Sequence, residues 1–240
     1  RIIKFPALIL IVSGGHTELV LMKNYGKYKI IGQTRDDAAG ECFDKCARLL
    51  GLKYPGGPAI AAEAAKFKIL NLKFKITLPR PMINSSDFDF SFSGLKTAVL
   101  YSYNDLIKKY PPKILKPAMA AEVQDAIVDV LVAKTLKAAR QYKPKTVMLA
   151  GGVAANKNLR EKTAETFGSP KIPSFDFRSG RLEPIGSETL RIERAFFVPE
   201  MPYTTDNAAM IAACGYFRYL AKKTTRDSWK KIEMDANLTL

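Results

Sequence analysis

Short apolar segments in the first 34 residues set the predicted start of the fold. Residues 7–13 are almost entirely apolar, which is typical of a buried strand. Residues 17–23 and 28–34 either alternate between apolar and polar positions or run apolar, and residues 24–26 have the composition of a turn between them. The pattern predicts a three-strand meander at the N-terminus.

Helical periodicity dominates the rest of the chain. The longest predicted helix, 117–141, repeats apolar residues every three or four positions and carries more on its opposite face, as a core helix does. A short buried strand is predicted at 146–150, and this mixture of strands and helices predicts an α/β fold class. Residues 169–200 follow no period, and we interpret them as an insertion. The other helices are predicted at 38–50, 59–67, 93–103, 153–166 and 206–220.

The net charge of the chain is +15, and its pI is near 9.7. A chain this basic attracts polyanions such as nucleic acid, although lysines scattered over a solvated surface would give the same total. Two basic clusters stand out, and each is either a phosphate-contacting surface or a solvated face. They are Lys66, Lys68, Lys73, Lys75 and Arg80 around Phe67 and Phe74, and Arg218, Lys222, Lys223, Arg226, Lys230 and Lys231.

The histidine and cysteine content excludes several classes of protein. His16 is the only histidine, which disfavours a self-contained metalloprotease, and no G-x-S-x-G elbow supports a serine hydrolase. His16 would then simply hydrogen-bond backbone at its turn. Cys42, Cys46 and Cys214 make an odd number, so we expect a reducing cytosol, with Cys42 and Cys46 as buried structural thiols rather than a metal pair.

The sequence contains no recognisable targeting signal. No apolar run approaches the roughly 18 residues of a membrane span, and no signal peptide is recognisable. We therefore expect a cytoplasmic protein that does not associate with a membrane. The chain begins with arginine rather than methionine, which predicts a fragment or a processed product.

Three Gly-Gly pairs are the most informative local feature. Gly14-Gly15 follows a predicted strand, Gly56-Gly57 lies between two predicted helices, and Gly151-Gly152 joins a strand to a helix. Glycine lets main-chain amides approach a ligand closely, and a helix N-terminus adds positive potential for phosphate. Neither a Walker A loop nor a Rossmann fingerprint is present, so the pairs predict a nucleotide site of another kind, with two glycine turns around the nucleotide.

Several aspartates have two possible roles. Asp206, next to Thr204 and Thr205, has the position of a residue in the first turn of a helix, and a capping role fits it better than a ligand role on sequence alone. Asp36 and Asp37 precede a predicted helix and would stabilise its dipole. Asp44, inside an apolar helix, either faces solvent or reaches a ligand hydroxyl.

Five ordered stretches of the sequence are informative when they are taken together. They are Ile11 to Leu19; Asp36 to Lys45 with Leu49 to Pro58; Phe90 to Thr97; Gly151 to Arg160; and Thr205 to Met210. In this order they resemble one family, the tRNA threonylcarbamoyladenosine transferases (TsaD), in their bacterial type. The resemblance covers about residues 5–168 and 203–220.

The resemblance implies an actin-like (ASKHA, sugar-kinase-like) ATPase fold, of which this chain would form mostly the second lobe. Residues 1–210 would be the nucleotide-binding C-terminal lobe, and 211–240 a helix and basic tail returning toward a missing N-terminal lobe. The implied reaction moves a threonylcarbamoyl group from threonylcarbamoyl-AMP to N6 of the adenosine 3′ of the anticodon in tRNAs that read ANN codons. Because the position matches the family's metal-ligating aspartate, the resemblance replaces the cap-only interpretation of Asp206 with a metal role. The implied substrate-binding or nucleotide-binding residues are Ile11, Val12, Ser13, Gly14, Gly15, Asp44, Gly57 and Asn156.

The resemblance also implies a cofactor and partners. One divalent metal is expected, iron first, with zinc or magnesium as alternatives, and the nucleotide ligand is threonylcarbamoyl-AMP or ATP. Two histidine ligands of the family lie in a segment upstream of Phe5, so this chain alone is predicted to be inactive. The partners would be tRNA, a paralogous TsaB-like subunit and a TsaE-like ATPase. Two other functions remain open: an ATPase or small-molecule kinase of the same fold, and a non-catalytic derivative.

Overall fold

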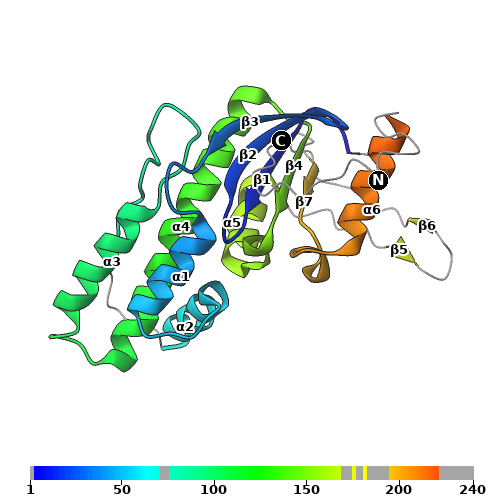
Figure 1. Cartoon of the computed structure of the whole chain (residues 1–240). Helices are drawn as coiled ribbons and strands as arrows, with labels where there is room; N and C mark the ends of the chain where they lie inside the picture. Colours follow the sequence, from blue (N-terminus) through cyan, green and yellow to red (C-terminus); the bar gives the residue numbers. More distant parts are fainter. Residues whose placement is uncertain (1–2, 71–75, 169–174, 177–180, 183–194, 222–240) are drawn as a thin grey trace, which may run out of the picture.

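The structure is a computed structural model that describes residues 3–70, 76–168, 175–176, 181–182 and 195–221. Within these ranges the chain folds as an α/β structure around one sheet with helices packed beside it (Figure 1). The predicted members of the first basic cluster at 73 and 75, and those of the second cluster beyond 221, lie outside the described residues.

A five-stranded sheet in the order β3-β2-β1-β4-β7 forms the centre of the fold. The predicted meander is confirmed: β1 (Ala7–Val12), β2 (Thr17–Asn24) and β3 (Lys27–Gln33) pair antiparallel. β4 (Thr146–Ala150) then pairs parallel to β1, with Ile11 opposite Ala150. Because β1 lies between two neighbouring strands, its apolar sequence is buried. Since β1 and β4 are parallel, the C-terminal ends of the two strands lie side by side.

The last strand of the sheet corrects the prediction for 169–200. β7 (Ala195–Phe197) pairs parallel to β4, so the end of this segment belongs to the main sheet rather than to an insertion. β5 (Phe175–Asp176) and β6 (Arg181–Leu182) form a separate antiparallel pair, and the rest of the segment up to β7 lies outside the described residues.

The helices bury most of the core. α4 (Pro112–Tyr142) is the predicted long helix, and it buries side chains on several faces because α2 (Gly56–Leu70), α5 (Lys157–Phe167) and the sheet all contact it. α1 (Ala39–Leu49) packs against α2 and α3 (Ser93–Leu106). Figure 1 shows α1, α2 and α3 gathered beside α4, away from the sheet.

α2 and α4 begin three and five residues earlier than predicted. Two other helices begin later than predicted, because an asparagine side chain caps each of them. A short 3-10 turn, η1 (Gly152–Ala155), follows β4, and α5 begins only after Asn156, whose side chain accepts a hydrogen bond from the Leu159 amide. Likewise α6 (Ala208–Leu220) begins after Asn207, which accepts from the Met210 amide. Asparagine satisfies a free amide of the first turn in both cases.

Charged side chains hold the irregular segment 76–92 against the helices. Arg80 pairs with Glu122 and Asp129 of α4, so in this structure it belongs to an ion-pair network rather than to a free basic surface. Lys134, fully buried on α4, donates to the Ser85 hydroxyl and the Asp87 backbone carbonyl. These contacts fix the approach of the chain to the start of α3.

Asp36 stabilises a different helix from the one predicted. Its carboxylate accepts hydrogen bonds from the Phe92 amide at 2.7 Å, the Ser93 amide at 3.3 Å, and the hydroxyls of Ser91 and Ser93. Burial alone would raise the pKa of Asp36, but these hydrogen bonds outweigh burial and lower the pKa below its usual value. Asp36 therefore anchors the N-terminus of α3, whereas Asp37 pairs with Lys45 at 2.6 Å.

α6 is an apolar helix whose own side chains are all exposed. Phe217 of this helix stacks on Tyr25 at 4.1 Å, and Tyr25 in turn meets Phe5 edge to face. Large apolar side chains remain uncovered along the helix within the described part of the chain, among them Met210, Ile211, Tyr219 and Leu220. Exposed apolar area of this kind is typical of contact surfaces for proteins, membranes or ligands.

Candidate nucleotide site

The turn after β1 is closed by the hydroxyl of Ser13. The Ser13 amide donates to the His16 carbonyl at 2.8 Å, and the Ser13 hydroxyl accepts from the amides of Gly15 and His16. The His16 ring lies 3.4 Å from the same hydroxyl, so its side chain contacts Ser13 and not the backbone that the sequence predicted as its partner. Gly14 has no other atom within 4 Å of the position of an added β-carbon, so its α-carbon borders open space.

The first turn of α1 packs directly on this glycine turn. The Gly40 amide donates to the Ser13 carbonyl at 3.1 Å. A β-carbon at Gly40 would lie 2.5 Å from the same carbonyl oxygen, so a side chain there would push the helix off the turn. Glycine at 40 therefore brings the positive end of α1 against the residues 13–15.

The second glycine turn lies beside the first because β1 and β4 are neighbours. Gly151 has a φ of 86°, and a β-carbon there would meet the Val12 carbonyl oxygen at 2.3 Å. Both the conformation and the space require glycine. A β-carbon built on Gly152 would lie 3.9 Å from the methyl carbon of Thr205, so this turn lies beside the segment before α6.

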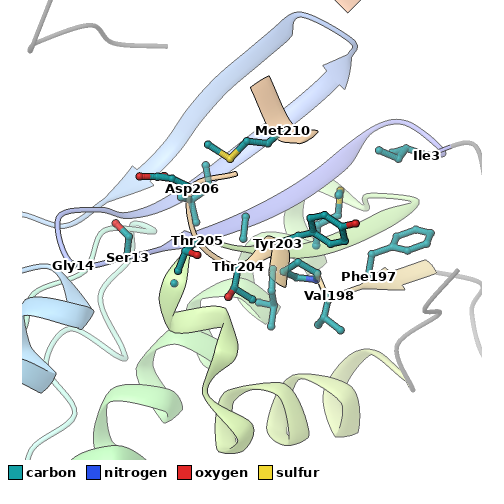
Figure 2. A pocket seen from close by; sticks show the side chains of 17 residues that line it. Ile3, Ser13, Gly14, Phe197, Val198, Tyr203, Thr204, Thr205, Asp206 and Met210 are labelled. Atoms are coloured by element: carbon teal, nitrogen blue, oxygen red, sulfur yellow. The ribbon is translucent and has the colours of Figure 1, made fainter. Parts of the chain in front are cut away.

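A pocket of about 900 Å³ opens between these turns and the segment 203–206. Figure 2 shows Ser13, Thr205 and Asp206 near Gly14 at one end, and Phe197, Val198 and Tyr203 at the other. The pocket thus has a polar end with glycine turns and an apolar end, which suits a ligand that carries both an anionic group and an apolar body.

The pocket contains four of the predicted site residues: Ile11, Ser13, Gly14 and Asp206. Gly151, Gly152 and Tyr203 also line it, and they were not among the predicted ligand contacts, although the Gly-Gly pair signalled the turn at 151. The pocket lining does not include Val12, which is buried, or Gly15, which is exposed. The roles of all these residues toward a ligand stay predictions.

Asp44, Gly57 and Asn156 do not line the pocket. Asp44 is one helical turn from Gly40, about 6 Å along α1, and its carboxylate accepts from the Gly56 amide at 2.7 Å. This contact places the Gly56-Gly57 pair beside α1 and shows Asp44 half-buried rather than on a solvent face. Asn156 follows η1, where its side chain caps α5 and donates to Gln124.

Asp206 is the exposed residue just before the cap of α6. Because Asn207 is the capping residue, the capping interpretation of Asp206 is wrong, and Asp206 is instead one of the residues that line the pocket (Figure 2). In the described part of the chain, no group of three or more histidine, cysteine, aspartate or glutamate side chains gathers to hold a metal ion. Asp206 therefore offers one carboxylate ligand, which by itself does not make a metal site.

The cysteines of α1 are structural, as predicted. Cys42 and Cys46 are fully buried, with their sulfur atoms 3.9 Å apart and unbonded. A hydrogen bond with Cys46, together with burial, raises the pKa of the Cys42 thiol well above its usual value, so it stays protonated. Cys214, in contrast, is exposed on α6.

The fold is similar to that of a solved structure, T. kodakarensis HypF. The two superpose with a TM-score of 0.50 and 16% sequence identity, over 85% of this chain and 22% of that protein. At this identity the likeness concerns the fold alone. The architecture is that of an actin-like ATPase fold.

The family model for TsaD, tRNA N6-adenosine threonylcarbamoyltransferase, matches residues 1–213. The chain belongs to this family. It is 46% identical over 219 residues to the tRNA N6-adenosine threonylcarbamoyltransferase of Syntrophomonas wolfei, and 45% identical over 223 residues to that of Dehalococcoides mccartyi. These alignments cover 91% and 93% of this chain but 56% and 57% of the relatives, so the chain spans little more than half their length.

The helices do not have the character of membrane spans. None of those in the described ranges combines the length and the apolar composition that crossing a membrane requires.

Proposed function

We propose that this chain is the nucleotide-binding part of a tRNA N6-adenosine threonylcarbamoyltransferase, with threonylcarbamoyl-AMP bound in the pocket between the glycine turns and Asp206. The observation that carries the proposal is the meeting of the turns 13–15 and 151–152 at one end of a single pocket. Family membership supports the reaction, and the cytoplasm, where tRNA is modified, is the proposed location.

The chemistry needs positioning more than a nucleophile on the enzyme. The N6 amine of adenosine attacks the carbamoyl carbon, the bond from that carbon to the phosphate oxygen breaks, AMP leaves with the bonding electrons, and the amine loses a proton. The main-chain amides of Gly14 and Gly152 would hold the phosphate, because nothing fills the space beside Gly14, whereas the Ser13 and Gly15 amides already donate within their turn. Holding the two reactants in one geometry supplies much of the rate of such a transfer.

The family's divalent metal, with iron as the first choice, would polarise the reacting group when bound. Asp206 is the residue of this chain that we propose as a ligand. Because the described residues provide no further cluster for a metal, we derive no step of the reaction through it. The remaining ligands and the TsaB-like and TsaE-like partners belong to the proposal for the complete protein.

The exposed apolar face of α6 supports the view that this chain does not act alone. We propose that it packs against the polypeptide that the longer relatives carry outside the matched region, since the alignments leave over two-fifths of their length unmatched. Chain without that polypeptide is therefore expected to bind the adenylate but to transfer nothing to tRNA.

Binding of threonylcarbamoyl-AMP by isothermal titration calorimetry tests the proposal. Gly14→Val places a side chain in space that is empty in the protein, so it should fold normally and lose at least about tenfold in affinity. Gly215→Val is the matched control, because a β-carbon there also meets nothing within 4 Å and the residue lies on α6, outside the pocket.

The outcome separates the proposal from other activities of the same fold. Equal affinity of wild type and Gly14→Val, or hydrolysis of ATP stimulated by a small sugar with no binding of threonylcarbamoyl-AMP, would contradict it. Unchanged thermal melting of both valine variants would show that any loss of affinity comes from the pocket.

A further inference from the structure

Two segments of the sequence carry cations without any acidic residue. Residues 45–62 and 106–121 contain no aspartate or glutamate, although the chain has 23 of them. The segments lie far apart in the sequence, so neither forms a basic cluster by itself. Their basic residues other than Lys45 are Arg48, Lys53, Lys108, Lys109, Lys113 and Lys116.

The fold brings these two segments to the same end of the helical layer. The first contains the end of α1 and its connection to α2, and the second contains the connection from α3 to α4 and the first turns of α4. A β-carbon built on Gly51 would lie 3.4 Å from the Nζ of Lys116, so the two segments lie side by side. Figure 1 shows the ends of α1 and α3 and the start of α4 together, on the side away from the sheet.

The cations of this surface, which we call the basic end, are not neutralised by the described part of the chain. Arg48, Lys53, Lys108, Lys109 and Lys113 are exposed, and within the described ranges none of the six basic residues forms an ion pair. One exposed acid, Asp105, lies nearby in sequence at the end of α3.

The sequence-predicted basic cluster around Phe67 differs in each of these respects. Its described cations, Lys66 and Arg80, pair with Glu63, Glu122 and Asp129, so their charges are largely neutralised within the protein. Free cations placed side by side attract a polyanion, whereas paired ones contribute little to its binding.

An exposed aromatic ring indicates which polyanion fits. Tyr54 is 85% exposed and follows Lys53 directly. A ring beside phosphate-binding cations is the arrangement that RNA-binding surfaces use, because unpaired bases stack on the ring. A surface that binds an anionic membrane usually has several exposed apolar side chains next to its cations. In the segment 45–62, Tyr54 is the one large apolar side chain that is exposed, which favours RNA.

We infer that the basic end contacts the phosphate backbone of the tRNA, with Tyr54 available to stack on an unpaired base. The inference rests on the proposed function for its choice of RNA. α1 connects the two surfaces: Gly40 in its first turn touches the glycine turn, and its 11 residues lead to the basic end about 16 Å away. When the target base of the tRNA enters the pocket, the basic end would thus hold the phosphate backbone of the same tRNA next to the pocket.

Fluorescence anisotropy tests this inference by measuring the binding of an unmodified tRNA transcript that reads ANN codons at several salt concentrations. The test variant is Lys109→Gln with Lys113→Gln, which removes two exposed charges. The matched control is Lys27→Gln with Lys29→Gln, which removes two exposed lysines of β3.

The slope of log affinity against log salt is negative, and removal of each lysine that binds a phosphate should make it shallower by about 0.9. For two such lysines, the ratio of the affinities at about 50 mM and about 200 mM salt should fall roughly tenfold relative to wild type. The β3 control should keep the wild-type slope. Tyr54→Ala should weaken binding without changing the slope, because a stacked ring carries no charge.

Titration of threonylcarbamoyl-AMP into the same samples separates this inference from the proposed function. An unchanged salt slope in the Lys109/Lys113 variant, with adenylate binding intact, would overturn the inference and leave the proposed function standing. Equal losses of tRNA affinity in the test and control variants would also overturn the inference, since the lysines would then act only through the net charge of the chain. Binding of the basic end to phosphatidylserine vesicles in preference to tRNA would overturn it as well.

Discussion

Gly151→Ala tests how strictly the structure requires the second glycine turn. In the structure Gly151 has a φ of 86°, and its added β-carbon would lie 2.3 Å from the Val12 carbonyl oxygen and 2.8 Å from its carbonyl carbon. The obstacle is the backbone of β1, which is paired on both sides, so it cannot move away as a flexible side chain would.

The expected cost combines two effects. A non-glycine residue held at positive φ costs about 1–3 kcal/mol, and forcing a methyl group into packed backbone adds about 1–3 kcal/mol. The sum, roughly 2–6 kcal/mol, is a large part of the typical stability of a domain, which is about 5–15 kcal/mol. For a chain of this size it corresponds to a fall in Tm of roughly 5–20 °C.

Thermal and denaturant unfolding, followed by circular dichroism, measure this cost. Gly14→Ala is the control, because no atom lies within 4 Å of its added β-carbon, and its stability should stay within about 0.5 kcal/mol of wild type. If Gly151→Ala melted at the wild-type temperature, β1 and β4 would not approach each other as described, and the geometry of the proposed pocket would be wrong.

Two further predictions concern titration and thiol chemistry. The folded pKa of Asp87 is lowered to about 2 by a hydrogen bond from Ser85 and the Lys134 cation, and that of Asp36 is lowered too, so their stabilisation is present above the unfolded pKa of about 4 and is lost as pH falls toward 2. Denaturant unfolding should show this loss, and Asp36→Asn with Asp87→Asn should flatten it; a mutant with the wild-type pH dependence would contradict the assignment. Ellman's reagent should modify Cys214 in the native chain and reach the two α1 thiols only after unfolding, and rapid native reaction of three thiols would show that α1 is not packed as described.

The regular elements were largely predictable from the sequence because their patterns are local. The meander, α4 and β4 follow directly from apolar periodicity, and the structure places them close to the prediction, although α4 begins five residues earlier than predicted. The helix starts at 157 and 208 were missed because the asparagine caps are single residues, which do not alter the periodicity around them. β7 was missed because three residues are too few to show alternation.

The site was predictable only in part, because it depends on contacts between distant segments. The glycine pairs signalled close backbone approach, and Gly151 against Val12 and Gly56 against Asp44 confirm such an approach at two of the three pairs. No local pattern shows that Asp36 reaches Ser93, or that Gly51 lies beside Lys116, since each pair joins elements more than 50 residues apart. The basic end is invisible in the sequence for the same reason.

A crystal structure of this chain soaked with threonylcarbamoyl-AMP tests the central proposal most directly. We expect the phosphate within about 2.7–3.2 Å of the main-chain amide of Gly14 or of Gly152, with the ligand inside the pocket that Asp206 lines. Well-ordered adenylate bound elsewhere on the chain, with the pocket between the two glycine turns filled only by solvent, would contradict it.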